Sequence, residues 1–171
     1  MPVKAPGKQP EKPLRGEKMH DTYFVYESPF GNIVIESDGN SITGLKTEGD
    51  AKPKGKNEAN TLTDITAMQL KEYFTGKRKK FDVPLNPQGT DFQCAVWKAL
   101  QNIPYGKTRS YKQIAQAIGN PKACRAVGMA NNKNPIWILI PCHRVIGTDG
   151  TLTGYGGGIE MKKRLLSIEK R

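Results

Sequence analysis

The sequence predicts a protein of two small domains, with strands and one helix in the first and mainly helices in the second. Its 171 residues are enough for one ordinary domain or for two small ones. Short apolar runs separated by turn residues fill positions 23–46, which is typical of strands, whereas apolar stripes at helical period follow position 90. The segment 84–89 lies between the two patterns and predicts a linker. We therefore expect an α/β domain over 20–85 and a second domain over 90–171.

The N-terminal half begins with a segment unlike the rest of the chain. Residues 1–19 are rich in Pro, Gly, Lys and Glu and contain almost no large apolar residue, which predicts a flexible basic tail. Two short strands around a Pro/Gly turn are expected within 23–37, and a third over 41–46 follows the turn at 38–40. These three strands would form a β-meander.

A loop and a helix complete the first domain. Residues 48–60 are polar and contain Pro53 and Gly55, so we interpret them as a mobile loop. Residues 61–74 carry apolar side chains near helical period and predict a helix that ends at Gly76. Its apolar positions are Leu62, Ile65, Met68 or Ala67, Leu70 and Phe74. The basic run at 77–80 is interpreted as a solvated loop beside that helix.

Three short helices are expected from Thr90 onwards. Thr90 can cap the first of them, with Gln93 three residues later. The apolar stripe of this helix consists of Phe92, Val96, Trp97 and Leu100. The second helix is predicted over 110–118 and the third over 121–131. Two short helices joined by a tight turn that contains glycine are the outline of a helix-turn-helix.

The third helix differs from one that reads the major groove, because besides Arg125 it presents mostly small side chains. Small residues would let the helix approach the narrower minor groove closely, with Arg125 as its single probe. A tightly packed core helix is the alternative interpretation.

The C-terminal end carries a turn, a loop and a helix. Asp149 and Gly150 predict a small hairpin within 145–152. The glycine-rich segment 154–158 suits a closing loop, and 160–169 predict an amphipathic helix. The side chains expected to face inward are Met161, Leu165, Leu166 and Ile168. Glu169 ends this helix, where it can orient a histidine or be solvated.

The positive charge of the chain is concentrated in its second half. Residues 1–89 carry 14 basic and 12 acidic side chains, and residues 90–171 carry 13 basic and 4 acidic ones, so the second half holds +9 of the net +11. Such asymmetry indicates a face that binds a polyanion, because Lys and Arg that neutralise phosphates supply most non-specific affinity for nucleic acid. A merely soluble basic surface is the alternative.

Several classes of protein are excluded by composition. No run approaches the ~20 apolar residues that a membrane span requires, and the N-terminus lacks the apolar core of a signal peptide. The protein is expected to be cytoplasmic, or nuclear in a eukaryote, without a membrane partner. Its cysteines are Cys94, Cys124 and Cys142 and its histidines His20 and His143, a set that favours neither a disulfide framework nor a metal site.

The segment 138–146 places Cys142 and His143 side by side in an otherwise apolar stretch with one basic residue. A cysteine reacts as its thiolate, so a neighbouring base and positive charge make it a nucleophile at neutral pH. Neighbours in an extended strand point to opposite faces. His143 can therefore reach the sulfur only if Pro141 introduces a turn. The alternative is a buried strand whose Cys behaves as a small hydrophobe.

The motifs of the second half of the chain, taken together, resemble those of the DNA repair alkyltransferases that act on O6-alkylguanine, the methylated-DNA–protein-cysteine methyltransferases. The resemblance covers 90–171 almost without gaps and is looser over 20–85. It rests on Tyr111, Arg125–Gly128, Asn134–Pro135, Ile140–Ile146, Gly154–Tyr155 and Glu169. It implies a ribonuclease-H-like α/β domain followed by a mainly α domain with helix-turn-helix and winged-helix character.

The resemblance also implies a reaction without a cofactor or a metal. Cys142 would attack the alkyl carbon on guanine O6, and O4-methylthymine is a further expected substrate. His143 would act as base through a bridging water, Glu169 would orient that His, and Asn134 would hold the segment, which is the logic of a catalytic triad. Because a thioether is a poor leaving group, each protein molecule would act once, as a suicide enzyme.

The expected partner is double-stranded DNA bound through its minor groove by a monomer, with the damaged nucleotide flipped out. In family terms, Arg125 would fill the vacated place in the stack, and Tyr111 would donate a hydrogen bond to the leaving guanine. The small residues expected on the DNA-binding face are Cys124, Ala126 and Gly128. The residues expected to form the base pocket are Val145, Trp137, Tyr155 and Gly156.

Three departures from the family pattern stand out. Trp137 occupies a position where many members have a smaller residue, so bulky adducts are expected to fit poorly. Gly156 offers only a backbone donor where some members have Ser, and the first domain lacks the Cys and His of a zinc site. Three rival functions remain open: a lesion sensor without transfer, a helix-turn-helix regulator, and a cysteine hydrolase.

Overall fold

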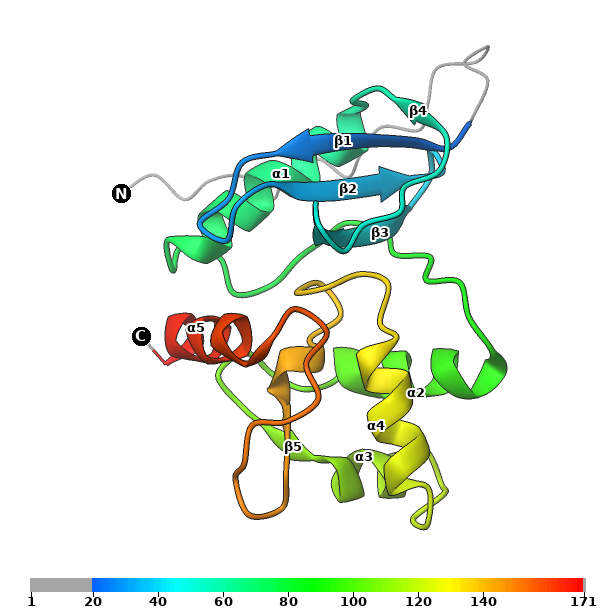
Figure 1. Ribbon diagram of the computed structural model, residues 1–171, viewed down its shortest axis with the longest axis vertical. Helices are drawn as coiled ribbons and strands as arrows, with labels where there is room; N and C mark the ends of the chain where they lie inside the picture. Colours follow the sequence, from blue (N-terminus) through cyan, green and yellow to red (C-terminus); the bar gives the residue numbers. More distant parts are fainter. Residues whose placement is uncertain (1–19, 171) are drawn as a thin grey trace.

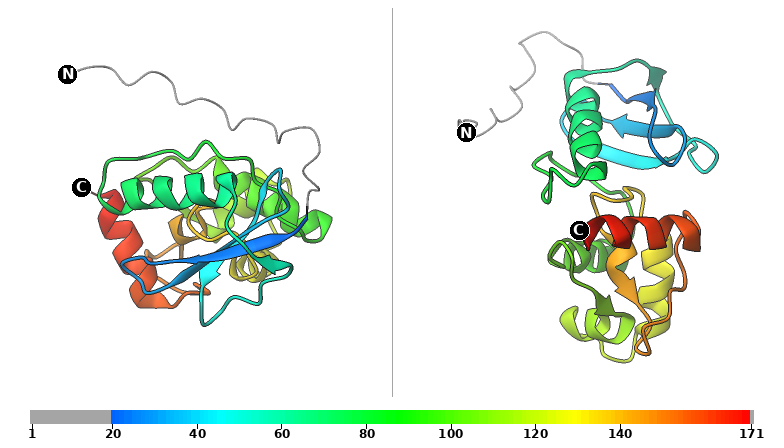
Figure 2. Two further views of the ribbon diagram at one scale, coloured as in Figure 1. Left: turned by 90° about the horizontal axis from the view of Figure 1, so that it is seen from above. Right: turned by 90° about the vertical axis from the view of Figure 1, so that its left-hand side faces the viewer.

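The computed structural model describes residues 20–170, so the predicted tail at 1–19 lies outside the described part. The chain forms two domains, one above the other in Figure 1, with a sheet and one helix in the first and four short α-helices in the second. This agrees with the predicted fold class. Figure 2 shows the last helix of the chain at the side of the second domain that faces the first.

The sheet of the first domain has the order β3-β2-β1-β4. Strands β1 (Thr22–Tyr26), β2 (Ile33–Ser37) and β3 (Ile42–Thr47) pair antiparallel, as expected of the predicted meander. The turn between β1 and β2 is closed by a hydrogen bond from Gly31 N to Ser28 O, and Gly31 has a φ of 88° that glycine adopts readily.

The predicted loop over 48–60 is in part wrong, because it contains the short strand β4 (Lys56–Asn57), which pairs parallel with β1. Helix α1 (Thr61–Phe74) has the predicted bounds and begins with a capping box between Asn60 and Thr63. Of the alternative apolar positions, Met68 is 54% exposed and Ala67 is half-buried, so Met68 does not belong to the core.

The second domain is built on α2 (Asp91–Gln101), α3 (Tyr111–Ala117), α4 (Cys124–Asn132) and α5 (Ile159–Glu169). Val96, Trp97 and Leu100 of α2 are buried, and the indole Nε1 of Trp97 donates to Ala130 O of α4 at 2.9 Å. The predicted stripe of α2 therefore faces the helix-turn-helix pair formed by α3 and α4.

Two predictions in this domain need correction. Helix α4 begins at Cys124 rather than at Pro121, because residues 121–123 form a turn closed by Ala123 N and Asn120 O. The predicted hairpin over 145–152 is not a ladder. A turn does occur at Gly150, but β6 (Val145–Ile146) pairs in parallel with β5 (Arg109–Ser110) instead. The local turn forms, but the strand before it pairs with a distant strand and not with the residues that follow the turn.

The outer edge of β3 joins the two domains through backbone hydrogen bonds. Ile42 N donates to Pro84 O, and Asn86 N donates to Ile42 O, so the linker runs along this edge. Further along, Leu45 N donates to Pro135 O and Trp137 N donates to Leu45 O, both at 2.9 Å. A single cluster of buried side chains also contains residues from both domains. The segment before Cys142 is thereby fixed to the sheet of the first domain.

Within residues 20–170, none of the helices has the length and apolar character needed to cross a membrane.

The capping box of α2 provides a test of how this domain is stabilised. Thr90 Oγ1 accepts from Gln93 N, and Gln93 Oε1 accepts from Thr90 N. We expect Thr90→Ala to lower the free energy of unfolding by about 1 kcal/mol, because an N-terminal donor of the helix loses its acceptor. Urea denaturation measures this change. Thr90→Ser keeps the hydroxyl and should retain most of the stability; an equal loss in both variants would contradict the capping role.

Candidate active site

Tight backbone turns precede Cys142. Ile138 has a φ of 73°, which is rare for a β-branched residue and strained. Short turns then follow, in which Leu139 N donates to Trp137 O and Cys142 N donates to Ile140 O, both at 2.8 Å. Cys142 opens a 3₁₀ turn over Cys142–Arg144 directly after Pro141. The turn predicted at Pro141 is present, and the segment is not a plain strand.

The thiol of Cys142 is buried and bound by asparagine. Its residue is 2% exposed, and Asn134 Nδ2 donates to Sγ at 3.0 Å and to Ile140 O at 2.8 Å. Asn134 Oδ1 accepts from Ile136 N, which fixes the orientation of the amide. Burial raises the pKa of Cys142 to about 11, although the Asn134 donor and nearby Lys162 act in the opposite direction. The resting sulfur is therefore a thiol that needs a base.

His143 is fully buried and pairs with the carboxylate of Glu169. The Nε2 atom of His143 lies 2.7 Å from Glu169 Oε1. Burial lowers the pKa of His143, and the Glu169 carboxylate offsets this only in part. The imidazole is thus neutral near pH 7. With Nε2–H directed at Glu169, the Nδ1 atom carries a lone pair and has the properties of a base.

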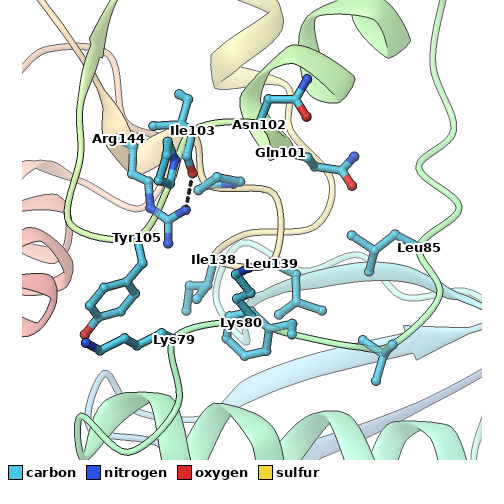
Figure 3. A pocket seen from close by; sticks show the side chains of 14 residues that line it. Lys79, Lys80, Leu85, Gln101, Asn102, Ile103, Tyr105, Ile138, Leu139 and Arg144 are labelled. Carbon is cyan, nitrogen blue, oxygen red and sulfur yellow. Dashed lines mark hydrogen bonds between the residues drawn. The ribbon is translucent and has the colours of Figure 1, made fainter. Parts of the chain in front are cut away.

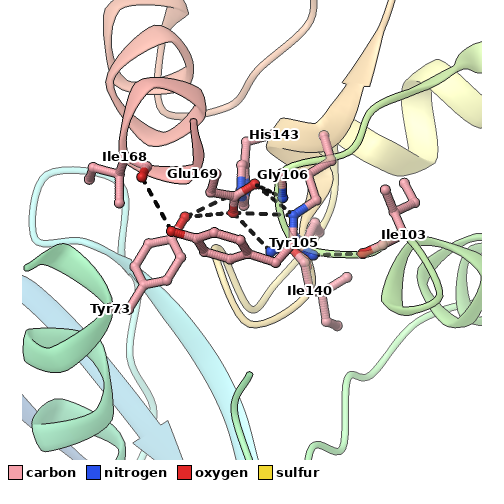
Figure 4. A network of polar contacts seen from close by, with 10 residues as sticks. Tyr73, Ile103, Tyr105, Gly106, Ile140, His143, Ile168 and Glu169 are labelled. Atoms are coloured by element: carbon pink, nitrogen blue, oxygen red, sulfur yellow. Dashed lines mark hydrogen bonds and ion pairs between the residues drawn. The ribbon is translucent and has the colours of Figure 1, made fainter. Parts of the chain in front are cut away.

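Glu169 is the last residue of α5 and the centre of the polar network in Figure 4. Arg144 Nε and Nη2 donate to its oxygens at 2.8 to 3.2 Å, and Arg144 Nη1 donates to Ile103 O at 2.7 Å. Gly106 N donates to Oε2 at 3.4 Å. Burial alone would raise the pKa of Glu169, but the donors His143 and Arg144 bring it to about 2. The carboxylate is ionised at any physiological pH.

Unsatisfied polar atoms collect around the cysteine. Among residues 20–170, the buried side-chain atoms without a hydrogen-bond partner are Asn131 Oδ1, His143 Nδ1 and Tyr155 Oη. Each belongs to a neighbour of Cys142: Asn131 Nδ2 donates to Cys142 O, His143 follows Cys142 in the chain, and Tyr155 interacts electrostatically with its sulfur. Orphaned buried polar groups are costly and mark places where function takes precedence over stability.

The loop over 154–158 lies against the same region. Tyr155 is 8% exposed, and its ring centroid is 5.8 Å from that of Trp137, which is also buried. A Cβ added at Gly156 would meet Trp137 at 3.3 Å. The structure therefore brings together three residues assigned to the base pocket and shows that Trp137 supports this loop.

Tyr111 connects the helix-turn-helix to that loop. Its hydroxyl donates to Thr153 O at 2.8 Å, and burial raises the pKa of Tyr111, so the group is a protonated donor at neutral pH. The position of a Cβ at Gly128 in α4 would lie 3.8 Å from the Tyr111 ring. Tyr111 therefore lies between the α4 helix and the closing loop.

Helix α4 presents one face to the core and one to solvent. Val127, Ala130 and Asn131 are buried, whereas Arg125 and Ala126 are exposed and Met129 is 69% exposed. Cys124 and Gly128 are half-buried at the border of the two faces. One face of this helix packs in the core, as the alternative interpretation expected, while Arg125 and Ala126 face solvent. Contact of the exposed face with a minor groove stays a prediction.

Sequence reasoning missed two residues of the network, Tyr73 and Lys162. Tyr73 of α1 donates to Glu169 Oε1 at 2.7 Å, and Lys162 Nζ donates to Val145 O at 2.5 Å and to Thr153 O at 3.0 Å. Burial lowers the pKa of Lys162 to about 8, against the effect of Cys142. The helical period was the available signal, because both residues fall on the buried side of their helices.

A separate cleft of about 590 Å³ lies between the domains, and neither Cys142 nor Tyr155 lines it. In Figure 3, Lys79 and Lys80 face it from the loop after α1, opposite Gln101 and Asn102 at the end of α2. In the predicted solvated run at 77–80 the three lysines are exposed, whereas Arg78 is half-buried and pairs with Glu72. Lys79 and Lys80 also form a wall of this cleft. Pro141 and Arg144, on either side of Cys142 and His143 in the chain, also line the cleft, so it borders the reacting segment without reaching the thiol.

Among residues 20–170, no three or more His, Cys, Asp or Glu side chains are grouped so that they could hold a metal ion. The chemistry that these side chains support by themselves is nucleophilic attack by sulfur. In such an attack Asn134 would stabilise the developing thiolate, neutral His143 would be the base, and Glu169 would stabilise the resulting imidazolium.

Two family models match the chain. The one described as the DNA binding domain of 6-O-methylguanine DNA methyltransferase matches residues 91–171. The one described as the ribonuclease-like domain of the same family matches residues 22–87. Together they span both domains of the fold described above.

Similar proteins carry related names. A methylated-DNA–protein-cysteine methyltransferase of Mycolicibacterium paratuberculosis is 58% identical over 152 residues, which cover 87% of this chain and 92% of the relative. A protein with the same name from Methanosarcina acetivorans is 49% identical over 154 residues, which cover 86% of this chain and 97% of the relative. The crystal structure of Mycobacterium tuberculosis OGT in complex with DNA matches with a TM-score of 0.83 and 48% identity, covering 87% of this chain and 92% of that one.

The ionisation of Cys142 can be measured by its alkylation with a small haloacetamide. We expect labelling to accelerate as the pH rises toward 11, because the pKa of about 11 keeps the thiol protonated at neutral pH. Asn134→Ala should move the profile to still higher pH, since the thiolate loses its donor. Mass spectrometry of labelled peptides reads out each cysteine, with Cys94 and Cys124 as internal controls. Half-maximal labelling of Cys142 at neutral pH, or an unchanged profile in Asn134→Ala, would contradict this account.

Proposed function

The chain belongs to the 6-O-methylguanine DNA methyltransferases, and on that premise we propose that Cys142 is the residue that accepts the alkyl group. The activity of the family is DNA repair by transfer of an alkyl group to a cysteine of the protein. One observation carries the assignment to Cys142: its thiol is held by Asn134 beside a buried, neutral His143 whose other nitrogen pairs with Glu169. Cys94 and Cys124 are half-buried and lie outside this network.

The reaction is a direct displacement at the alkyl carbon. His143 Nδ1 takes the proton of Cys142 through a bridging water, and the thiolate attacks the carbon bound to O6 of guanine. The new S–C bond forms as the C–O6 bond breaks, and guanine leaves with the electron pair. Charge that develops on the imidazole is stabilised by Glu169 at 2.7 Å. The orphaned Nδ1 atom fits this role, because it is a buried acceptor without a partner among residues 20–170.

Tyr111 assists the leaving group. Its protonated hydroxyl now donates to Thr153 O, and it would exchange this acceptor for the guanine ring when the base enters. Donation to the departing base stabilises its negative charge in the transition state, an effect of ~10²–10⁴ in rate for general acids. Because Lys162 also donates to Thr153 O, that carbonyl keeps a partner after the exchange.

The base is recognised by backbone and loop. The carbonyls of Cys142 and Val145 accept from the exocyclic amine of guanine. Val145 O accepts a side-chain bond from Lys162 and has a second lone pair. Cys142 O accepts from Asn131 Nδ2 at 3.3 Å and from Val145 N, so a bond from guanine would replace the long one from Asn131. Tyr155 and Gly156 close over the ring. Trp137 lies directly beneath this loop, which supports our expectation that bulky O6 adducts fit poorly.

The DNA is bound by the exposed face of α4 in the minor groove. The small residues Cys124, Ala126 and Gly128 allow a close approach, and the +9 charge of residues 90–171 favours the phosphates. The target nucleotide is flipped out of the stack at a cost of a few kcal/mol, and Arg125 fills the vacated place. The protein acts as a monomer and once only, because the thioether product is stable, and O4-methylthymine is a second substrate.

Intact-protein mass spectrometry after incubation with an O6-methylguanine oligonucleotide tests the acceptor. We expect a gain of one methylene per protein, located at Cys142 by peptide mapping and saturating at one equivalent. Cys142→Ser should show no gain while it binds DNA normally, since Ser keeps the shape of the side chain but is a far weaker nucleophile.

Other outcomes would overturn the assignment. A methyl group on Cys94 or Cys124 would move the acceptor elsewhere. DNA binding without any mass change would indicate a lesion sensor or a helix-turn-helix regulator, and repeated ester turnover would indicate a hydrolase.

The role of Arg125 is tested by comparing substrates with and without a base stack. We expect Arg125→Ala to slow transfer from duplex DNA by about 10-fold or more. Flipping a base out of the stack costs a few kcal/mol, and without Arg125 no side chain fills the vacated place to offset that cost. Transfer from free O6-methylguanine should hardly change. Arg78→Ala removes the same charge from the first domain and serves as control. Equal losses on both substrates would contradict the assignment.

A further inference from the structure

We propose that Tyr73, in the ribonuclease-like domain, is a positioning residue for the reaction, because it binds the Glu169 carboxylate and so fixes the proton on His143 Nε2. This inference rests on the proposed function and extends it, since it gives the first domain a part in the chemistry. Figure 4 shows Tyr73 reaching from α1 to the carboxylate at the end of α5. The residues are 96 positions apart in the sequence and belong to different domains.

The hydrogen bond between Tyr73 and Glu169 is short, buried and charge-assisted. Tyr73 is fully buried, and its hydroxyl donates to Glu169 Oε1 at 2.7 Å, the same oxygen that lies 2.7 Å from His143 Nε2. Hydrogen bonds to an ionised acceptor in a dry environment are about twice as strong as neutral ones. Burial and the neighbouring Glu169 both raise the pKa of Tyr73, so the hydroxyl keeps its proton throughout the working range of pH.

The geometry also selects the tautomer of His143. The Tyr73 oxygen lies 3.5 Å from His143 Nε2 but 2.7 Å from the carboxylate, and a phenol has one proton to donate. That proton is therefore donated to Glu169. His143 Nε2 then faces two acceptors, the Tyr73 oxygen and Glu169 Oε1, so it must carry the imidazole hydrogen to form a hydrogen bond with either. The lone pair of the imidazole is then left on Nδ1, where a base for Cys142 is required.

Other groups around this pair set the electrostatic background. Arg144 and Cys142 lie in the 3₁₀ turn, Lys162 lies on α5, and Tyr105 lies after α2. Arg144 Nη2 also donates to Glu169 Oε1, at 2.8 Å, but Arg144 comes from the same domain as His143. Tyr73 is the donor from the first domain. Loss of its hydroxyl would leave more negative charge on Glu169 to stabilise the imidazolium.

The test is Tyr73→Phe in the full chain, with single-turnover transfer from an O6-methylguanine duplex measured across pH. We expect the rate at pH 7 to fall about 10-fold, the range for a lost hydrogen bond to a charged group. We also expect the acidic limb of the profile to move to higher pH. A more stable imidazolium raises the pKa of His143, and protonated His143 cannot accept the proton of Cys142. In a Glu169→Gln background, where the carboxylate is absent, the same change should have little further effect.

Tyr26→Phe is the matched control, because Tyr26 also donates to a carboxylate, Asp64, at 2.7 Å, but within the first domain alone. Thermal melting and DNA affinity monitor folding of every variant. A lowered melting temperature with an unmoved pH profile in Tyr73→Phe, or an equal shift in Tyr26→Phe, would overturn the inference. Absence of transfer by the unchanged chain would overturn the proposed function as well, whereas normal transfer by Tyr73→Phe would overturn the inference alone.

Discussion

The ionised carboxylate of Glu169 is the constraint on which the rest of the site depends. A buried charge without partners costs several kcal/mol, so its oxygens must be surrounded by donors. It also ends α5, where the helix dipole disfavours a negative charge. The fold answers with donors from distant elements: Arg144 and His143 from the 3₁₀ turn, Gly106 from the loop after α2, and Tyr73 from α1. The carboxylate thereby assembles the turn that presents Cys142.

The state of the thiol follows from the same burial. Burial keeps the Cys142 thiol protonated, and Asn134 Nδ2 donates to its sulfur. Under the proposed function, His143 is the base that accepts the thiol proton. A nucleophile that reacts once benefits from this arrangement, because a thiolate exposed to solvent would be consumed by other electrophiles. The unpaired atoms His143 Nδ1 and Tyr155 Oη are the cost of a site shaped for a transition state rather than for stability.

The first domain is part of this arrangement through its backbone as well as through Tyr73. The edge of β3 binds the linker and then the segment 135–137 that leads to Cys142. These segments cover the edge of β3, which would otherwise be open. The strained Ile138 lies between Trp137, which is bonded to β3, and the 3₁₀ turn that begins at Cys142. The ribonuclease-like domain therefore fixes the backbone that leads to Cys142.

Much of the local structure, and the family, could be predicted from the amino-acid sequence alone. Apolar runs between turn residues predicted the meander, helical period predicted α1, and a cap with an apolar stripe predicted α2. The residues around Cys142 identified the family. The sequence did not determine β4, the parallel pairing of β5 with β6, or the start of α4, because these depend on partners distant in the chain. Nor did it indicate that Tyr73 and Lys162 belong to the site, since nothing local distinguishes an inward tyrosine that packs from one that binds a carboxylate. Only the tertiary structure decided which buried polar groups meet, because their free energy depends on partners that folding brings together.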